Sequence, residues 1–352
     1  MQQACRLVEQ GFPQGSCSTF YKPSKGLFKG HAEGRACDVT MQWEDGVPSR
    51  KIKSFLLSRP EDYLSLYQSG CNMSCLKCHS WEFSQYRAGE WMSPEGAVRL
   101  AEEYARLVTV WEPRERATSS HAQSLCKHCG QCVTRGKRSV YCPEILTPGQ
   151  VILSPQGYGP ARNIVAFTGG DLACRPEWYS RVAELIKEKG LDLWVLLETN
   201  GYGLTPQNLD DLQRAGIDSF WLDIKAWDNE VHRKLTGVEN QRILRLPEEL
   251  LHRWFTLEVL SLFIPGWVEE DQIGQIAALL AAADPGIYFT ILAFFGQYKL
   301  DGVPGPNLEQ MLRAYRASKE AGLQNVRLGN LGVFIKSDRD YQILLQQAGD
   351  AV

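Results

Sequence analysis

The sequence predicts an α/β fold, a partial (β/α)6 TIM-like barrel with an inserted subdomain and an irregular N-terminal lobe. After Tyr63, short runs rich in β-branched and aromatic residues alternate with longer amphipathic runs. One connection, from about Trp111 to Pro160, is too long for an ordinary βα loop and contains a cysteine cluster. Residues 1 to about 60 are rich in Gly, Pro, Lys and Ser and have little hydrophobic periodicity. These three observations carry the fold prediction.

Strands and helices are expected to alternate along the barrel. Several helices begin at proline or with an acidic first turn, and Gly190, Gly216 and Gly322 lie where helices prefer to end. The predicted strands are 64–67, 163–168, 193–198, 219–223, 255–263 and 287–294, with a candidate seventh around Val326. The predicted helices are 93–107, 176–189, 206–215, 228–235, 269–283 and 307–321.

Length, composition and charge set the domain organisation and exclude some partners. We expect a lobe over 1–60, the barrel over 61–335, an insertion over 111–160 and a tail over 336–352. The 38 Lys+Arg against 41 Asp+Glu give a net charge of −3, so no basic field favours nucleic acid. No uncharged stretch is long enough to cross a bilayer, and no apolar run near the N-terminus resembles a signal peptide. The sequence therefore predicts a cytoplasmic protein that binds neither nucleic acid nor membrane.

The 11 cysteines are an odd number, and seven of them fall in two tight groups. In a reducing compartment this favours metal or redox chemistry over a disulfide framework. Cys5, Cys17 and Cys37 lack metal-ligand spacing, so we expect ordinary buried or free thiols. The alternative is a further metal site that includes His31. Cys174 is expected to serve packing.

The first cysteine group, Cys71, Cys75 and Cys78, has C-x3-C-x2-C spacing and follows the first predicted strand directly. It is therefore expected at the carboxyl end of the barrel strands, where βα loops build active sites. Thiolates suit iron–sulfur clusters or zinc. Three thiolates leave one position of a four-iron cluster open to a substrate or cofactor. The alternative is a zinc knuckle with His79 or a distant residue as the fourth ligand.

Three more polar segments end successive predicted strands at the same mouth of the barrel. They are Thr168-Gly169-Gly170-Asp171, Glu198-Thr199-Asn200 and Asp223-Ile224-Lys225. In this order after the C-x3-C-x2-C motif, they resemble the radical S-adenosylmethionine (SAM) superfamily. Segments 222–225, 232–237 and 264–267 resemble glycyl-radical-enzyme activating enzymes such as the pyruvate formate-lyase activator. Segments 78–85, 298–300 and 322–330 resemble the radical SAM member of the AmmeMemoRadiSam group.

This resemblance implies a catalytic [4Fe–4S] cluster on Cys71, Cys75 and Cys78, with SAM on the open iron. It implies that Glu198 and Asp223 help to bind a monovalent cation beside SAM. The remaining implied SAM-site residues are Lys77, His79, Thr168, Gly169, Gly170, Asp171, Thr199, Asn200 and Lys225. The chain departs from the family pattern at Asp171, where Glu is usual, and at Lys77, where an aromatic residue packs on adenine. Phe295 and Leu260 lie where the activator has a histidine and an arginine.

The second group, Cys126, Cys129, Cys132 and Cys142, supplies four thiolates, enough to close a second [4Fe–4S] cluster. Zinc is the alternative, with His121 or His128 as a candidate ligand beside three cysteines. The resemblance favours iron, because many glycyl-radical activators carry ferredoxin-like insertions at this place. Basic residues surround the group. Their positive charge would offset the negative charge of the thiolates or bind an acidic electron donor such as a flavodoxin or ferredoxin. The alternative is that they form an ordinary solvated loop. They are Lys127, Arg135, Lys137 and Arg138.

Three functions remain open from the sequence. The first is a radical SAM enzyme that cleaves SAM reductively to a 5′-deoxyadenosyl radical and abstracts hydrogen from a protein partner. The second is a radical SAM enzyme that acts on a small molecule or peptide. The third is a non-catalytic iron–sulfur protein of electron transfer or assembly.

Overall fold

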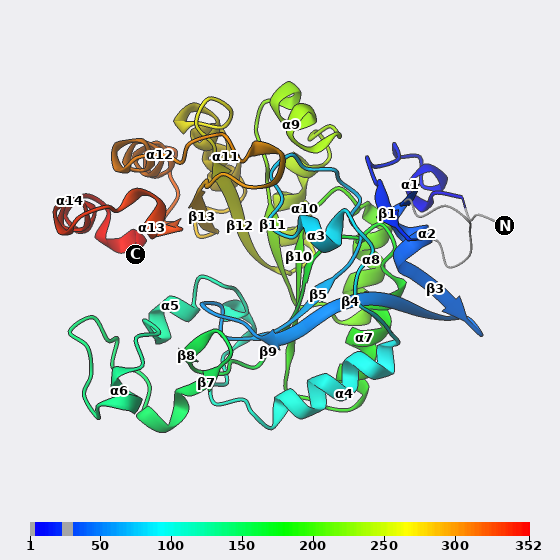
Figure 1. Cartoon of the computed structure of the whole chain (residues 1–352), viewed down its shortest axis with the longest axis horizontal. Coiled ribbons are helices and arrows are strands. Elements are labelled where there is room, and N and C mark those ends of the chain that lie inside the picture. The colour runs from blue at the N-terminus through cyan, green and yellow to red at the C-terminus, as the bar shows by residue number, and fades with distance from the viewer. Residues whose placement is uncertain (1–3, 23–30) are drawn as a thin grey trace. The chain divides into compact units, whose positions relative to one another are not determined.

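The computed structural model describes residues 4–22 and 31–352, and these fall into two compact units. The first unit comprises Met1–Asn72, Glu82–Thr199 and Gly203–Phe220. The second comprises Met73–Trp81, Asn200–Tyr202 and Trp221–Val352. Figure 1 labels the helices and strands of both. These two units do not correspond to the predicted lobe, barrel, insertion and tail, whose boundaries stay predictions.

The sheet of the first unit runs in the order β3-β4-β5-β9-β10. Strands β5 (Leu64–Gln68), β9 (Ile164–Gly169) and β10 (Trp194–Thr199) are parallel neighbours. Strands β3 (Met41–Glu44) and β4 (Val47–Leu57) extend the sheet in antiparallel pairing, and β6 (Glu90–Met92) pairs with β4. The β9 and β10 strands are almost wholly buried, which explains their continuous apolar sequences.

Two of the three main helices of this unit begin after a residue whose hydroxyl caps them. Helix α4 (Pro94–Ala105) starts after Ser93, whose hydroxyl accepts a hydrogen bond from the Gly96 amide at 3.2 Å. Helix α8 (Pro206–Ala215) is capped by Thr205 in the same way. Helix α7 (Glu177–Glu188) packs Trp178 against Phe167 of β9, with ring centroids 5.3 Å apart. Helices α4 and α7 lie side by side (Figure 1).

The second unit contains the strands β11 (Ser219–Asp223), β12 (Thr256–Phe263), β13 (Tyr288–Ala293) and β14 (Asn325–Gly329). Strands β12, β13 and β14 are parallel neighbours in chain order. The helices are α9 (Asn229–Thr236), α10 (Leu246–His252), α11 (Glu270–Ala283), α12 (Leu308–Glu320), α13 (Leu331–Phe334) and α14 (Asp338–Ala348).

The predicted fold class is confirmed. All seven predicted strands and all six predicted helices are present within a few residues of their expected ends. Consecutive parallel strands joined by helices are the pattern of a partial βα barrel. The alternation was visible in the sequence because each strand carries a short apolar run and each helix a longer amphipathic one.

Two stretches are more regular than expected. Residues 41–57 of the expected irregular lobe form the β3–β4 hairpin, which turns at Asp45 and Gly46 with φ values of 50° and 80°. An Asp-Gly pair with two positive φ values is a strong hairpin signal that the hydrophobic pattern alone does not contain. Residues 338–348 of the expected tail form α14, which is capped by Ser337. The segment 23–30 of the lobe lies outside the described residues.

The expected insertion contains little regular structure and a small apolar core. It includes the short helices α5 (Ala122–Leu125) and α6 (Gln131–Thr134) and the hairpin of β7 (Ile152–Ser154) and β8 (Gly157–Gly159). The core consists of Val110, Leu125, Leu146 and Val151, with Cys126, Cys132 and Tyr158 packed against it. So small a core stabilises a fold weakly, and such segments usually need a metal or another cross-link.

A fully buried arginine ties the start of this segment to β9. The Arg162 guanidinium donates to the Glu112 carboxylate, to the Thr118 carbonyl at 2.7 Å and to the Glu61 carbonyl at 3.1 Å. It also donates to the Arg116 carbonyl at 2.5 Å. One side chain therefore satisfies acceptors from several separate turns.

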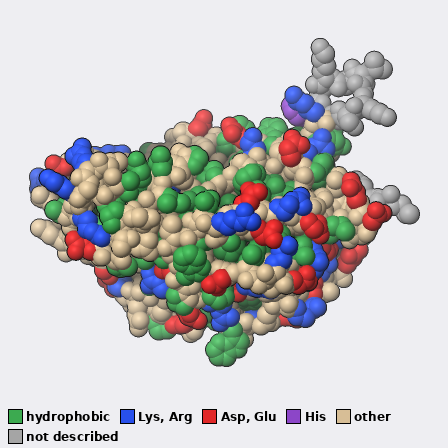
Figure 2. Space-filling model, turned by 90° about the horizontal axis from the view of Figure 1, so that it is seen from below, with side chains coloured by type: hydrophobic (Ala, Val, Ile, Leu, Met, Phe, Trp, Pro, Cys, Tyr) green, Lys and Arg blue, Asp and Glu red, His purple; other side chains and the backbone are tan. Residues whose placement is uncertain are grey.

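One face of the molecule shows no dominant charge. On the face shown in Figure 2, Lys and Arg side chains are interspersed with Asp and Glu side chains. No helix in the described part of the chain is both long and apolar enough to traverse a bilayer.

We expect Arg162→Met to lower the free energy of unfolding by about 3 kcal/mol or more, because it leaves the buried Glu112 carboxylate and several carbonyls without their donor. Urea unfolding measures the change. The control is Arg181→Met on α7, where the 40% exposed guanidinium pairs with Glu184 and Glu188. Loss of this surface pair should cost less than about 1 kcal/mol. Equal costs for the two variants would contradict the role given to Arg162.

Candidate active site

The loop of the first cysteine group begins at the end of β5 in the first unit. The Gly70 amide donates to the Phe83 carbonyl at 3.0 Å, and the Asn72 amide donates to the Asp171 carbonyl at 2.9 Å. Cys71, between these two anchors, is half-buried. The backbone on both sides of this cysteine is therefore fixed by hydrogen bonds.

Cys75 and Cys78 lie on the part of the loop that belongs to the second unit, and both are half-buried. The Ser74 amide donates to the Thr236 carbonyl at 3.1 Å, and the Leu76 amide donates to the Leu235 carbonyl at 2.7 Å. Both acceptors are in the last turn of α9, whose final carbonyls lack helical partners. The end of α9 thus holds the loop on either side of Cys75.

The segment 232–237, which contributed to the family resemblance, is fixed by a buried side chain. His232 is fully buried, and its Nδ1 donates to the Val238 carbonyl at 2.8 Å. Burial lowers the pKa of His232 to about 4, so the imidazole is neutral at pH 7. The segment 232–237 therefore supports the cysteine loop through its backbone.

The two glycines at the end of β9 are required by the close approach of residues that follow β5. Gly169 has a φ of 90°, and a Cβ there would lie 2.7 Å from the Phe83 ring. A Cβ on Gly170 would run into the carbonyl oxygen of Gly70. The family resemblance implies that these glycines belong to the SAM site, but neighbouring protein atoms already leave no room for a side chain at either position.

The Asp171 side chain is turned into the protein and is 4% exposed. Its Oδ2 accepts from the Thr199 hydroxyl and its Oδ1 from the Ala173 amide, both at 2.7 Å. Since its carbonyl also holds Asn72, Asp171 joins the ends of β9 and β10 to the first cysteine of the loop.

Glu198, near the end of β10, is half-buried and accepts from two neighbours in the same unit. The Tyr63 hydroxyl donates to Oε1 at 3.1 Å, and the Thr168 hydroxyl donates to Oε2. Burial, with the charges of Glu198 and Glu61, raises the pKa of Tyr67 to about 12. The sequence analysis missed Tyr63 and Tyr67; the position of Tyr67 in the first predicted strand was the available signal.

Asp223 and Lys225, at the end of β11, form an ion pair in the second unit through Lys225 Nζ and Asp223 Oδ2. Asp223 Oδ1 is buried and has no hydrogen-bond partner among the described residues. Burial acts to lower the pKa of Lys225, but Asp223 and the Cys75 and Cys78 thiolates outweigh it and raise that pKa. Lys225 therefore carries a full positive charge close to two of the cysteines.

Asn200 lies in a tight turn of the second unit. Its Oδ1 accepts from the Tyr202 amide at 3.0 Å, and Gly201 within the turn has a φ of 76°. An Asn side chain that accepts from an amide two residues on is typical of turns. This bond engages the Asn200 carbonyl oxygen in local structure.

Lys77 and His79 gather around residues that follow β13. The Lys77 ammonium donates to Gln297 Oε1 at 2.8 Å and lies 3.6 Å from the centre of the Phe295 ring. His79 Nδ1 lies 3.3 Å from the same Gln297 oxygen, and its ring meets that of Phe295 edge-on at 6.1 Å. Burial lowers the pKa of Lys77 to about 8; the Cys78 thiolate opposes this shift and Lys225 adds to it. No pattern in the sequence points to Gln297.

Two segments of the AmmeMemoRadiSam resemblance meet in the second unit. The rings of Trp81 and Tyr298 are stacked, with centroids 5.1 Å apart and planes inclined by 11°. The Lys299 amide donates to the Leu76 carbonyl at 3.2 Å. Residues 298–300 therefore support the cysteine loop from the far end of the chain.

The second cysteine group lies in the first unit, with Cys129 exposed and the other three half-buried. The His128 amide lies 3.3 Å from Cys126 Sγ, and the Arg138 guanidinium lies 3.5 Å from Cys142 Sγ. Burial raises the pKa of Cys126, as do the nearby Asp62, Cys132 and Cys129. N–H donors to cysteine sulfur are among the features that tune iron–sulfur clusters.

The two histidines weighed as zinc ligands both have protein partners. His121 is buried, with Nδ1 2.7 Å from the Thr118 hydroxyl. His128 Nε2 lies 2.9 Å from a carboxylate oxygen of the buried Asp62, which also pairs with Arg59. These contacts tie the cysteine segment to the residues just before β5.

The donor sets fit metal clusters by chemistry and burial. As the side chains stand, no three His, Cys, Asp or Glu residues within 4–22 and 31–352 form a closed metal-binding group.

Comparison with known proteins bears out the predicted resemblance. The model of the radical SAM superfamily matches residues 124–274. Over 162 residues the chain is 26% identical to the pyruvate formate-lyase 1-activating enzyme of Escherichia coli K12, an alignment that covers 42% of this chain and 65% of that enzyme. Over 250 residues it is 24% identical to the isethionate sulfite-lyase activating enzyme of Oleidesulfovibrio alaskensis, covering 61% and 73%. The AmmeMemoRadiSam likeness stays a prediction.

Solved structures show weaker similarity. A domain of a pyruvate formate-lyase-activating enzyme from Bacteroides vulgatus gives a TM-score of 0.41 at 20% identity, covering 47% of this chain and 98% of that one. Streptococcus suis SuiB bound to its precursor peptide SuiA gives 0.47 at 14% identity, covering 82% and 52%.

We expect Gly170→Ala to lower the free energy of unfolding by about 1–3 kcal/mol, because the added methyl group displaces the Gly70 carbonyl at the end of β5. Denaturant unfolding measures this. The matched control is Gly149→Ala, where an added Cβ has no neighbour within 4 Å. That variant should change stability by less than about 0.5 kcal/mol. A Gly170→Ala protein as stable as the control would show that the two strand ends can separate freely.

Proposed function

We propose that this chain, which resembles the radical SAM superfamily, is a radical SAM enzyme of the activating type. In this proposal Cys71, Cys75 and Cys78 hold a [4Fe–4S] cluster that binds SAM, and the enzyme abstracts hydrogen from a protein partner. The observation that carries the proposal is the cysteine loop: three half-buried thiols at C-x3-C-x2-C spacing, on a backbone held by the ends of β9 and α9. The relatives named as activating enzymes support the choice of a protein as substrate.

The cluster and SAM, when bound, would supply one-electron cleavage of the sulfonium to a 5′-deoxyadenosyl radical. The protein's own task is to fix the three thiolates, orient the nucleotide and keep out water and stray hydrogen donors. Hydrogen bonds to main-chain atoms on both sides of Cys71 and Cys75 serve the first task. Lys225, charged and close to Cys75 and Cys78, would attract the anionic cluster and the SAM carboxylate.

The end of β9 would receive the polar end of SAM through the backbone of Thr168, Gly169 and Gly170. Asp171 is then a positioning residue, because both of its carboxylate oxygens are engaged by Thr199 and Ala173. Thr199 and Asn200 would act likewise, as parts of the β10 terminus and the turn after it.

For the adenine we propose the ring of Phe295 together with His79. Phe295 is 36% exposed and takes the place of the aromatic residue that the family usually has at Lys77. Lys77 would orient these groups through its contacts with Gln297 and the Phe295 ring.

Asp223 and Glu198 remain the proposed carboxylates for a monovalent cation. The buried Asp223 Oδ1, without a donor among the described residues, is the atom best suited to this, since a buried acceptor gains from a cation partner. Glu198 already accepts from Tyr63 and Thr168 and would contribute through its charge.

The second cysteine group is proposed to hold a second [4Fe–4S] cluster that receives electrons from an external donor. Lys127, Arg135, Lys137 and Arg138 are all exposed. Large apolar side chains are exposed on the same segment: Val133, Val140, Tyr141 and Ile145. Basic charge around exposed apolar groups suits an acidic electron carrier such as a flavodoxin or ferredoxin.

A small molecule or peptide is the alternative substrate. Phe295 and the half-buried Leu260 stand where the activator has polar residues, which favours a different substrate face. A non-catalytic iron–sulfur protein is the third candidate, and the release of 5′-deoxyadenosine separates it from both enzymes.

We expect the anaerobically reconstituted chain to release 5′-deoxyadenosine from SAM when dithionite is added. Cys75→Ala should reduce the release at least about 100-fold, because the catalytic cluster loses a ligand. Chromatography of the quenched reaction measures the nucleoside. Absence of release from the wild-type chain, or its survival in Cys75→Ala, would refute the radical SAM assignment. Hydrogen transfer from an added glycyl-radical enzyme to the nucleoside, followed by deuterium label, would favour the protein substrate over a small molecule.

The variant Cys129→Ser should distinguish the roles of the two cysteine groups. We expect the iron content to fall from about eight to about four per chain, with dithionite-driven cleavage retained, because a small reductant reaches the first cluster directly. Cleavage driven by reduced flavodoxin should fall at least about tenfold. Unchanged iron content in Cys129→Ser would contradict a second iron–sulfur cluster.

A further inference from the structure

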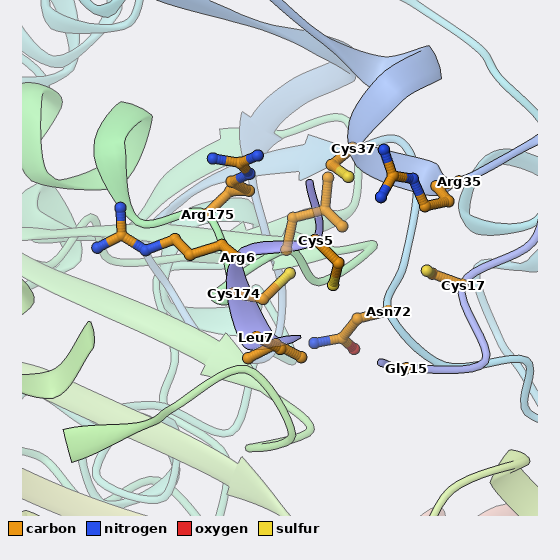
Figure 3. Close-up of a pocket in the computed structure, with 11 residues that line it drawn as sticks. Cys5, Arg6, Leu7, Gly15, Cys17, Arg35, Cys37, Asn72, Cys174 and Arg175 are labelled. Carbon is orange, nitrogen blue, oxygen red and sulfur yellow. The ribbon is translucent and has the colours of Figure 1, made fainter. Parts of the chain in front are cut away.

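Four cysteines that belong to neither group line one pocket of the first unit. They are Cys5, Cys17, Cys37 and Cys174, and they surround a cavity of about 20 Å³. Figure 3 shows the four side chains around this pocket. With them, each of the 11 cysteines of the chain falls into one of three groups.

The four residues come from separate segments. Cys5 immediately precedes α1 (Arg6–Glu9), and Cys17 lies shortly before β1 (Thr19–Tyr21). Cys37 lies in α2 (Ala36–Thr40), and Cys174 follows the Gly-Gly-Asp turn at the end of β9. No spacing rule in the sequence links positions so far apart, which is why a metal site was only the alternative for Cys5, Cys17 and Cys37 and why Cys174 was expected to serve packing.

The N-terminal segment is anchored firmly enough to present Cys5 to this pocket. The Arg6 guanidinium donates to Asn208 at 3.0 Å, to Glu177 at 2.9 Å and to Asp211 at 2.7 Å. The Arg175 guanidinium donates to the Ala4 carbonyl at 3.2 Å. These bonds fix the residues on both sides of Cys5 to helices α7 and α8 and to the residue after Cys174.

The four thiols are close enough to interact electrostatically. Burial raises the pKa of Cys37 to about 11, and the charges of Asp38 and Cys17 add to the shift. Burial also raises the pKa of Cys17, with Cys5 contributing. The pKa of Cys174 is raised by burial and then by Cys37, Asp171, Cys17 and Cys5. The raised pKa values of Cys17, Cys37 and Cys174 thus each include a contribution from another thiol of the group.

The size and chemistry of the pocket favour a single metal ion. A cavity of about 20 Å³ has room for one atom or ion about the size of a water molecule. A four-iron cluster needs much more room. Four thiolates are the ligand set of closed, tetrahedral structural zinc sites. Arg35 and Arg175 also line the pocket and would offset the negative charge of a zinc ion bound by four thiolates.

We propose that Cys5, Cys17, Cys37 and Cys174 bind one structural Zn²⁺ ion that fastens the N-terminal lobe to the end of β9. The thiols surround the pocket without yet forming a closed metal-binding group, as is also true of the two cysteine groups described above. Side-chain rotation toward the cavity would complete the site. His31, the ligand considered from the sequence, packs against Tyr86 at 5.9 Å and does not line the pocket.

The ion would brace the cysteine loop of the first group indirectly. Asn72, which follows Cys71, lines the same pocket, and Cys174 is three residues after Asp171, whose carbonyl holds the Asn72 amide. This zinc site is independent of SAM cleavage, so its test does not depend on the proposed function.

The test is elemental analysis of the full chain purified anaerobically, by plasma mass spectrometry. We expect about one zinc per chain in the wild type, and less than about 0.2 in Cys17→Ser and Cys37→Ser with the iron content kept. Cys129→Ser is the matched control, in which iron should fall and zinc remain. Circular dichroism establishes that each variant is folded.

Cobalt gives a second readout that needs no substitution. Protein produced with Co²⁺ should show the visible absorption of a tetrahedral cobalt–thiolate site, and this absorption should be absent from Cys37→Ser. If a serine variant fails to fold, titration of the wild type with a mercurial reagent should still release one zinc as four thiols react.

Three results would overturn the zinc proposal. The first is wild-type protein without zinc, and the second is zinc that stays in Cys37→Ser but leaves in Cys129→Ser. The third is a disulfide between any two of the four cysteines in protein handled without oxygen, because a disulfide removes two of the ligands.

Discussion

The close approach of β5 and β9 at their carboxyl ends is the constraint on which the candidate site depends. Gly170 has no room for a side chain because the Gly70 carbonyl lies against it, and Asn72 then reaches the Asp171 carbonyl. This contact determines where the chain leaves the sheet and hence where Cys71 lies. The inward-turned Asp171 extends the same contact to Thr199 of β10. Packing and hydrogen bonds within the protein thus join the ends of β5, β9 and β10.

The second unit supports its part of the loop in a similar way. The last carbonyls of α9 accept from the amides on both sides of Cys75, and Lys299 donates from residues after β13. The charges of Lys225 and Lys77 both interact with Cys78, and that of Lys225 also interacts with Cys75. A strand end and the loop itself therefore place positive charge close to these two cysteines.

Much of this architecture could be predicted from the sequence, because strands and helices alternate with distinct periods and the polar residues of the site directly follow strands. Cys71 comes soon after the end of β5, and Asp223 is the last residue of β11. Contacts between distant segments could not be predicted. Gln297 contacts Lys77 from beyond β13, and Cys174 lines the same pocket as Cys5, although the two residues are far apart in the sequence. The burial of Asp171 depends on a hydroxyl of the next strand, and no local pattern encodes such a partner.

The cysteine loop is held largely by main-chain groups, namely the carbonyls of Asp171, Leu235 and Thr236. Every residue has a main-chain carbonyl. The side chains at these positions can therefore be substituted as long as the backbone conformation is kept. Sequence divergence can then become large while the geometry around the thiols is inherited intact. Such an architecture is compatible with low sequence identity to relatives. Substitution should be least tolerated at the glycines that pack against carbonyl groups.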